Sequence, residues 1–155
     1  TRDPGLAATR CNRYISRIGG GHFATAWIGV VDARDRRIRY VDAGHGHGRH
    51  MRSGGEPHKL EGRGAIPLGI DAGAQFDLEE LSLEVADRLI LYSDGVAEIK
   101  GSRGDTFAPA VLDQILRRGG LPKDDVAAVI AGMEIFAGGS MPSDDASILA
   151  FDLPG

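Results

Sequence analysis

Residues 89–99, LILYSDGVAEI, constrain the fold of this chain more than any other segment. Four apolar residues lead straight into Ser-Asp-Gly, which predicts a buried strand that ends on a carboxylate and turns at once on a glycine. Asp144 and Asp145 hold the mirror position, just before the apolar segment 147–153. If the two segments are antiparallel neighbours, their acidic ends meet at one end of a sheet.

The first half of the chain reads as a helix followed by a hairpin. Apolar spacing predicts a helix over residues 5–17. The β-branched and aromatic residues of 23–32 predict a central strand that is covered on both faces. The alternation in 37–44 places Ile38 and Tyr40 on one face of the second hairpin strand and Arg37 and Arg39 on the other.

The second half adds short strands and then two helices. We expect a third short strand within 46–58, a loop over 62–74, a half-buried strand around Leu81, Leu83 and Val85, and a buried strand over 89–92. Helices follow over 108–118 and from Pro122 onward, the second with a buried stripe of Val126, Val129, Ile130 and Met133, and a closing strand lies at 147–153. The order predicts one α+β domain over residues 1–155, with layered antiparallel β-sheets flanked by helices.

Composition narrows the class of protein. A chain of 155 residues suits one domain, and the net charge of −4 argues against a non-specific nucleic-acid binder. Cys11 is the only cysteine, so no internal disulfide forms, which fits a reducing compartment. The longest apolar stretch is shorter than the roughly 20 residues of a membrane helix, and the first residues lack the layout of a signal peptide. We therefore expect a cytoplasmic protein with no membrane segment in this chain.

The acidic strand ends suggest metal chemistry. Converging carboxylates repel one another unless a cation joins them, and Mg²⁺ or Mn²⁺ takes oxygen ligands. Such an ion makes its bound water nucleophilic, and two ions hold both sides of a phosphoryl displacement. Gly95 would let the backbone turn tightly beside the ion. In the alternative interpretation, Asp94 caps a short helix at 95–100, and Asp144 and Asp145 lie in an ordinary loop.

Five segments in order carry a family resemblance: HFATAWIGVVD, RIRYVDAGH, AIPLGI, DRLILYSDGVAEI with GDTF after it, and SDDASILAF. Together they resemble the SpoIIE-like (RsbU-type) branch of the PPM metal-dependent serine/threonine phosphatases over residues 5–153. The resemblance implies two antiparallel sheets flanked by helices and a binuclear Mn²⁺ or Mg²⁺ centre at one end of them. It also implies that Asp94 and Asp144 are the catalytic metal ligands. Gly95 lies beside them, and Asp145 falls on a variable position of the motif.

One part of the family pattern is missing. The family begins with a Gly-Asp segment and a Gly-rich turn that supply the aspartate bridging the two metals, and this chain contains no such segment. Two interpretations follow. The chain is the C-terminal part of a longer protein that lacks the family's N-terminal segment here, or the domain is degenerate.

The resemblance implies a phosphatase that hydrolyses phosphoserine or phosphothreonine on a protein. It suggests an anti-sigma-factor antagonist as the substrate, in bacterial stress or developmental signalling, and an upstream sensor or regulatory domain. The alternative is a degenerate phosphatase fold that binds a protein partner without turnover. A third alternative is a small acidic domain whose aspartates only cap helices and form turns.

Histidines and arginines leave further alternatives open. His45, His47 and His50 are compatible with structural or solvated positions and also with metal binding. The basic segment suits contact with a phosphorylated protein or plain solvation of a hairpin; its members are Arg49, Arg52, Lys59 and Arg63. The loop 62–74 suits a specificity loop or a simple crossover.

Overall fold

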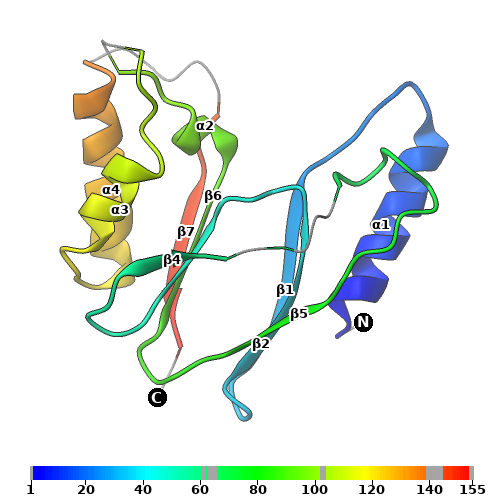
Figure 1. The fold of residues 1–155 in the computed structure, drawn as a ribbon, viewed down its shortest axis with the longest axis horizontal. Coiled ribbons are helices and arrows are strands. Elements are labelled where there is room, and N and C mark those ends of the chain that lie inside the picture. The colour runs from blue at the N-terminus through cyan, green and yellow to red at the C-terminus, as the bar shows by residue number, and fades with distance from the viewer. Residues whose placement is uncertain (1, 61, 63–65, 102–103, 139–144, 154–155) are drawn as a thin grey trace. The chain divides into compact units, whose positions relative to one another are not determined.

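The computed structural model describes residues 2–60, 62, 66–101, 104–138 and 145–153, which divide into two compact units. The first unit comprises Thr1–Gly46 and Glu61–Leu83, and the second comprises His47–Leu60 and Glu84–Gly155. Each unit contains an antiparallel sheet and at least one helix (Figure 1). The prediction of an α+β fold with antiparallel sheets flanked by helices is confirmed.

The first unit holds a three-stranded sheet in the order β1-β2-β5, with α1 beside it. Its elements are α1 (Pro4–Ile18), β1 (Ala26–Asp32), β2 (Arg37–Ala43) and β5 (Glu79–Ser82). The carboxylate of Asp3 accepts a hydrogen bond from the backbone N–H of Leu6, which satisfies one donor of the first turn of α1. Ala8 of this helix packs with Val41 and Ala43 of β2. The predicted helix over 5–17 is confirmed.

The position predicted for the first strand is wrong. Segment 23–32 forms β1 and pairs with β2 in a hairpin as expected, but β2 lies in the centre of the sheet and β1 at its edge. Gly29 and Val31 of β1 are exposed rather than covered. β2 takes the central position because its other edge pairs with β5, with Ile38 opposite Leu81. An unbroken apolar sequence does not reveal which strand of a hairpin receives that second neighbour.

The second unit holds a four-stranded sheet in the order β4-β3-β6-β7. Its elements are β3 (Gly48–Met51), β4 (Pro57–Lys59), β6 (Arg88–Tyr92), α2 (Asp94–Ala97), α3 (Ala110–Leu116), α4 (Pro122–Phe136) and β7 (Ile148–Asp152). The strand predicted within 46–58 is β3, whereas β4 was not predicted. Ile90 and Tyr92 of β6 pack against Leu112 of α3 and Val129 and Met133 of α4. The core of this unit therefore lies between the sheet and helices α3 and α4.

The buried stripe of α4 differs from the prediction at Ile130, and Val126 is only half-buried. Val129 and Met133 are buried as expected, but Ile130 is 45% exposed. Asp125 is buried instead and lies one turn before Val129. The apolar pattern did not predict which face of α4 is buried, because it assigns every aspartate to the solvent-exposed face. Asp125 is buried only because it has an ion-pair partner.

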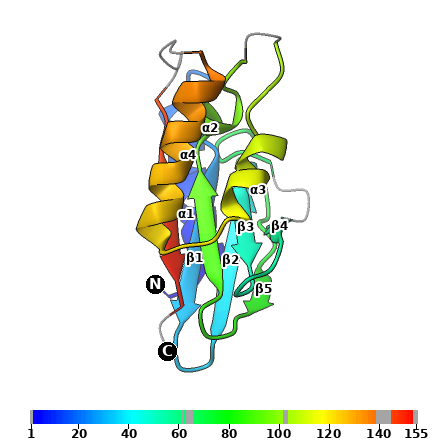
Figure 2. The ribbon, with the colours of Figure 1, turned by 90° about the vertical axis from the view of Figure 1, so that its left-hand side faces the viewer.

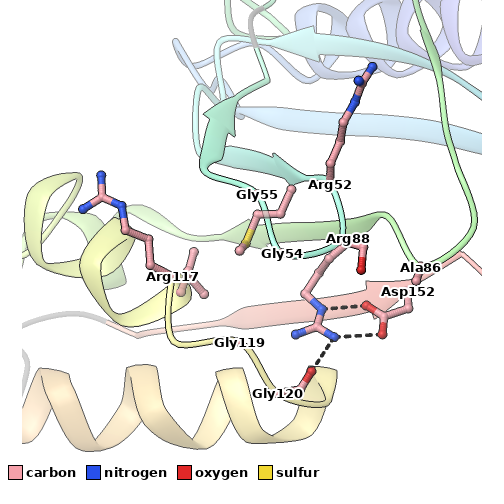
Figure 3. A pocket seen from close by; sticks show the side chains of 12 residues that line it. Arg52, Gly54, Gly55, Ala86, Arg88, Arg117, Gly119, Gly120 and Asp152 are labelled. Carbon is pink, nitrogen blue, oxygen red and sulfur yellow. Dashed lines mark hydrogen bonds and ion pairs between the residues drawn. The ribbon is translucent and has the colours of Figure 1, made fainter.

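The partner of Asp125 is Arg88 at the start of β6. The Arg88 guanidinium donates to Asp152 at 2.6 and 2.8 Å, to Asp125 at 2.5 Å and to the carbonyl of Gly120 at 2.8 Å. The hydrogen bonds that Arg88 donates to Asp152, the largest cause, and to Asp125 raise the pKa of Arg88 above its usual value. Figure 3 shows Arg88 facing Asp152 and Gly120 in a pocket of about 280 Å³. The cluster joins β6, β7, α4 and the loop before α4.

Loss of the Arg88 charge should destabilise the protein strongly. Arg88→Met keeps most of the side-chain volume but leaves Asp125, with a side chain only 4% exposed, without its partner. Breaking a buried ion pair in this way costs about 3–5 kcal/mol. Urea unfolding measures the change. The matched control is Arg37→Met, because Arg37 and its partner Glu80 are about half exposed. It should cost under about 1 kcal/mol. Equal effects of the two substitutions would contradict a structural role for the Arg88 cluster.

Candidate metal-binding site

The pairing of β6 with β7 brings the two acidic segments together. The strands are antiparallel, and Tyr92, the last residue of β6, faces Ile148, the first residue of β7. Ser93 extends the contact beyond the sheet, because its backbone N–H donates to the carbonyl of Ser147 at 2.9 Å. The prediction that segments 89–92 and 147–153 are neighbouring strands is therefore confirmed.

The Ser93 hydroxyl ties the two segments a second time. It accepts a hydrogen bond from the backbone N–H of Ser147 at 2.9 Å and donates to the carbonyl of Asp145 at 3.3 Å. The sequence analysis did not assign Ser93 a role. The signal available was a hydroxyl residue directly before Asp94, at a position where a backbone group of a neighbouring strand needs a partner.

Gly95 lies directly against the segment before β7. A Cβ atom built on Gly95 would stand 2.2 Å from the carbonyl oxygen of Asp145 and 2.8 Å from its carbonyl carbon. No side chain fits there, so glycine is required for this approach of two backbones. The expected tight turn at Gly95 is not present, because Gly95 lies within helix α2; the glycine is needed for the close approach of the backbone of residue 145.

Asp94 is the first residue of α2 rather than its cap. Ser93 holds the N-cap position without a side-chain cap bond, and Oδ1 of Asp94 accepts from the backbone N–H of Gly95 at 3.0 Å. The body of this short helix is anchored by the buried residues Val96 and Ala97. Asp94 itself is exposed at the end of β6. Asp94 is thus exposed to solvent, while the next residues of its helix are buried in the core.

The remaining predicted ligands are only partly described. Asp145 is exposed and lies beside Gly95, whereas Asp144 lies outside the described residues. Among residues 2–60, 62, 66–101, 104–138 and 145–153, no group of three or more His, Cys, Asp or Glu side chains is arranged to hold a metal. The described part of the chain therefore contributes Asp94 and Asp145 to the candidate site.

The one histidine and the one arginine of β3 have structural partners. Nε2 of His50 lies 2.8 Å from Oδ2 of Asp87, and both side chains are buried. Nε of Arg49 donates to Oδ1 of Asp113 at 2.8 Å, and Arg49 is 4% exposed. Arg49 therefore neither solvates a hairpin nor faces a substrate, and both interpretations of this residue are wrong. Its guanidinium lies 5.6 Å from the ring centre of Tyr92, whose pKa is raised by burial.

The RIRYVDAGH segment contains a buried carboxylate that the sequence analysis also missed. Asp42 is 6% exposed, and its side chain accepts hydrogen bonds from the backbone N–H groups of His45 and Gly46. Gly44 and Gly46 both have positive φ angles, of 72° and 68°. Asp42 therefore fixes the turn after β2, as aspartates do in Asx turns.

Comparison with known proteins identifies the family to which this chain belongs. The family model described as Stage II sporulation protein E (SpoIIE) matches residues 1–154. The chain belongs to the SpoIIE family. Protein IcfG of Synechocystis is 28% identical over 142 residues, which are 90% of this chain and 22% of that protein. Phosphoserine phosphatase RsbP of Bacillus subtilis is 34% identical over 77 residues, which are 50% of this chain and 19% of that protein. This SpoIIE-family chain thus spans about a fifth of the length of these curated relatives.

Solved structures share the fold of this family member. The SiaA-PP2C domain of Pseudomonas aeruginosa has a TM-score of 0.81 at 23% identity, covering 97% of this chain and 60% of that one. The RsbU and RsbW domains of Rv1364c from Mycobacterium tuberculosis give 0.76 at 22% identity, covering 99% of this chain and 43% of that one. The described helices include none with the length and apolar character that crossing a membrane requires.

Substitution of Gly95 should separate helix propensity from the close approach to residue 145. Within a helix, Gly→Ala normally stabilises by up to about 1 kcal/mol. In Gly95→Ala the new methyl would meet the Asp145 carbonyl at 2.2 Å, so we expect destabilisation by about 1–3 kcal/mol. Chemical denaturation gives the sign directly. The control is Gly73→Ala, whose Cβ would lie at an ordinary 3.4 Å from Asp71. A stabilised Gly95→Ala variant would show that the two segments are not in contact.

Proposed function

We propose that this domain is a metal-dependent phosphoprotein phosphatase of the PPM type. One observation carries the proposal: β6 and β7 pair so that the Ser93-Asp94-Gly95 turn lies against the backbone of Asp145. Two segments that are each acidic, and fifty residues apart in sequence, thus lie side by side in a SpoIIE-family chain. In this proposal Asp94 and Asp144 are catalytic, and Asp94, Gly95, Asp144 and Asp145 form this chain's part of the metal site.

The chemistry of the donors fits Mn²⁺ or Mg²⁺. Both ions prefer carboxylate and carbonyl oxygens, and Asp94 is exposed and directly precedes Gly95, which contacts the Asp145 backbone. Among the structures with this fold, one is a SpoIIE phosphatase domain presoaked with Mn, and another is RsbX in complex with magnesium. When bound, the ion supplies positive charge that polarises a phosphoryl oxygen and lowers the pKa of water. We propose that the complete domain holds two such ions.

The chain's own residues then serve to position the acidic groups. The Ser93 hydroxyl and the pairing of β6 with β7 hold Asp94 at a fixed place relative to residue 145. Gly95 keeps the two backbones in contact, and Val96 and Ala97 anchor the turn in the core. A phosphorylated side chain would reach this end of the sheet from solvent, because Asp94 and Asp145 are both exposed.

The substrate we propose is a phosphorylated protein. RsbP, one of the matched relatives, is named a phosphoserine phosphatase, and another match contains RsbU and RsbW domains in one chain. Within this proposal the substrate is an anti-sigma-factor antagonist, as the family resemblance implies. We also propose that residues 1–155 belong to one phosphatase domain within a longer protein that carries an upstream regulatory domain. The small share of the relatives that this chain spans supports that arrangement. We propose that the protein lies in the cytoplasm, because an exposed free thiol such as that of Cys11 suits a reducing compartment.

Asp94→Asn tests the activity with little change in shape. The test uses the longest gene product that contains these residues and measures release of phosphate from a phosphoserine peptide with and without Mn²⁺. We expect metal-dependent hydrolysis, and we expect Asp94→Asn to lower it by at least about a hundredfold, because a metal ligand is lost. The control is Asp77→Asn, an exposed aspartate in the other unit, which should leave the rate unchanged.

Two outcomes would contradict the proposed function. Full activity in Asp94→Asn would remove Asp94 from the site. An inactive wild-type protein that still binds a phosphorylated partner would favour the alternative of a binding module without turnover.

A further inference from the structure

A polar pocket lies at the start of β6, at the opposite end of that strand from Asp94. It measures about 280 Å³ and is lined by three turns of the second unit: the turn between β3 and β4, the turn before β6 and the loop between α3 and α4 (Figure 3). Helices α3 and α4 lie side by side (Figure 2), and the loop that joins them reaches the start of β6, where the Gly120 carbonyl accepts a hydrogen bond from Arg88. The proposed phosphatase chemistry leaves this pocket without a role.

The acidic side chain of the pocket is already bound. Asp152 is the only acidic residue among the described residues that line it, and both of its carboxylate oxygens accept hydrogen bonds from Arg88. Asp125 also binds Arg88, but it is 3% exposed and does not line the pocket. Arg88 donates four hydrogen bonds to these two residues and Gly120, so the fifth N–H of its guanidinium, on Nη1, has no partner within the described part of the chain. The cluster therefore offers a donor to a ligand.

Two further arginines of the pocket also keep donors for a ligand. Arg52 is exposed and, among the described residues, takes part in no side-chain hydrogen bond or ion pair. Arg117 binds the exposed Glu56 through Nε, and its two Nη groups have no partner in the part of the chain that the structure describes. Exposed ion pairs of this kind contribute little to stability, so Arg117 can turn toward a ligand. The Ser53 hydroxyl adds a neutral donor.

We propose that this pocket binds a phosphate monoester, independently of the metal site at the other end of β6. Its donors come from separate segments: Arg52 and Ser53 from the turn after β3, Arg88 from β6, and Arg117 from the end of α3. A phosphate group is tetrahedral and accepts hydrogen bonds from several directions, whereas a carboxylate presents two oxygens in one plane. Guanidinium groups suit phosphate because they donate two parallel hydrogen bonds and keep their charge.

Apolar residues and glycines shape the rest of the pocket. Met51 and Leu116 line it and are 6% and 0% exposed, so apolar atoms close its inner side. Glycines line it as well and let a ligand approach the backbone: Gly54, Gly55, Gly119 and Gly120. A free phosphate ion would leave the apolar side uncovered, whereas an ester places its organic group there. The pocket therefore favours a phosphate monoester over inorganic phosphate.

Isothermal titration calorimetry with O-phosphoserine tests the proposal. It uses the longest gene product that contains these residues, with EDTA present so that the proposed metal site neither binds nor hydrolyses the probe. We expect saturable binding of O-phosphoserine, weaker binding of inorganic phosphate and no binding of serine. Arg52→Met should weaken the binding of O-phosphoserine at least about tenfold, because a charged hydrogen-bond donor is lost, and Arg117→Met should do the same.

Matched controls locate the binding. Arg118 is exposed and follows Arg117 but lines an apolar hollow between α3 and α4 instead of this pocket, so Arg118→Met should leave the affinity unchanged. Asp94→Asn should also leave it unchanged, because Asp94 lies at the other end of β6. Circular dichroism melting checks that every variant folds. A phosphoserine peptide, compared with free O-phosphoserine, shows whether the phosphate group comes from a protein or from a small molecule.

The following results would each overturn the proposal: no saturable binding of O-phosphoserine, equal binding of serine or acetate, an affinity that Arg52→Met and Arg117→Met do not change, or an equal loss in Arg118→Met. Binding that Asp94→Asn abolishes would place the phosphate at the proposed metal site and also overturn it. A failure of the proposed phosphatase activity would not affect this result, because EDTA removes free metal ions from the binding assay.

Discussion

The antiparallel pairing of β6 with β7 is the interaction on which the rest of the second unit depends. Its register, with Tyr92 opposite Ile148, determines which residues meet where both strands leave the sheet. Slipping by one residue would turn every side chain of β7 to the other face. It would also remove the hydrogen bonds between Ser93 and Ser147 and the contact of Gly95 with Asp145. The register of β6 against β7 therefore determines where Asp94 and Asp145 lie relative to one another.

Stability and the proposed chemistry lie at opposite ends of β6. At its start, Arg88 is bound by Asp152 of β7 and Asp125 of α4, so charge there is buried and compensated. At its end, Asp94 is exposed beside the segment that contains Asp145. The proposed metal site would bring like charges together there, and the ion cluster at the start of β6 would help the strand to hold them until a cation binds.

The sequence predicted the helices and strands that depend on local pattern. It failed to predict strand positions and side-chain burial that depend on contacts between distant residues. The helix over 5–17, the hairpin and the neighbouring strands 89–92 and 147–153 follow from periodicity and turn chemistry, and all are present. The edge position of β1 and the burial of Arg49 follow from contacts with β5 and Asp113. Such contacts join residues far apart in the chain, so no local pattern reports them. In the candidate site, Asp94 and Gly95 were predicted from a motif, whereas the bridging hydroxyl of Ser93 was missed.

The most direct measurement of the central claim is the location of a bound ion. Crystals of the protein soaked in Mn²⁺ would give an anomalous diffraction peak at the position of the metal. A peak within coordination distance of the Asp94 carboxylate, next to the segment that precedes β7, is the result that we predict. A peak elsewhere on the protein, or none at Asp94 in crystals that contain Mn²⁺, would contradict a metal site at the junction of β6 and β7.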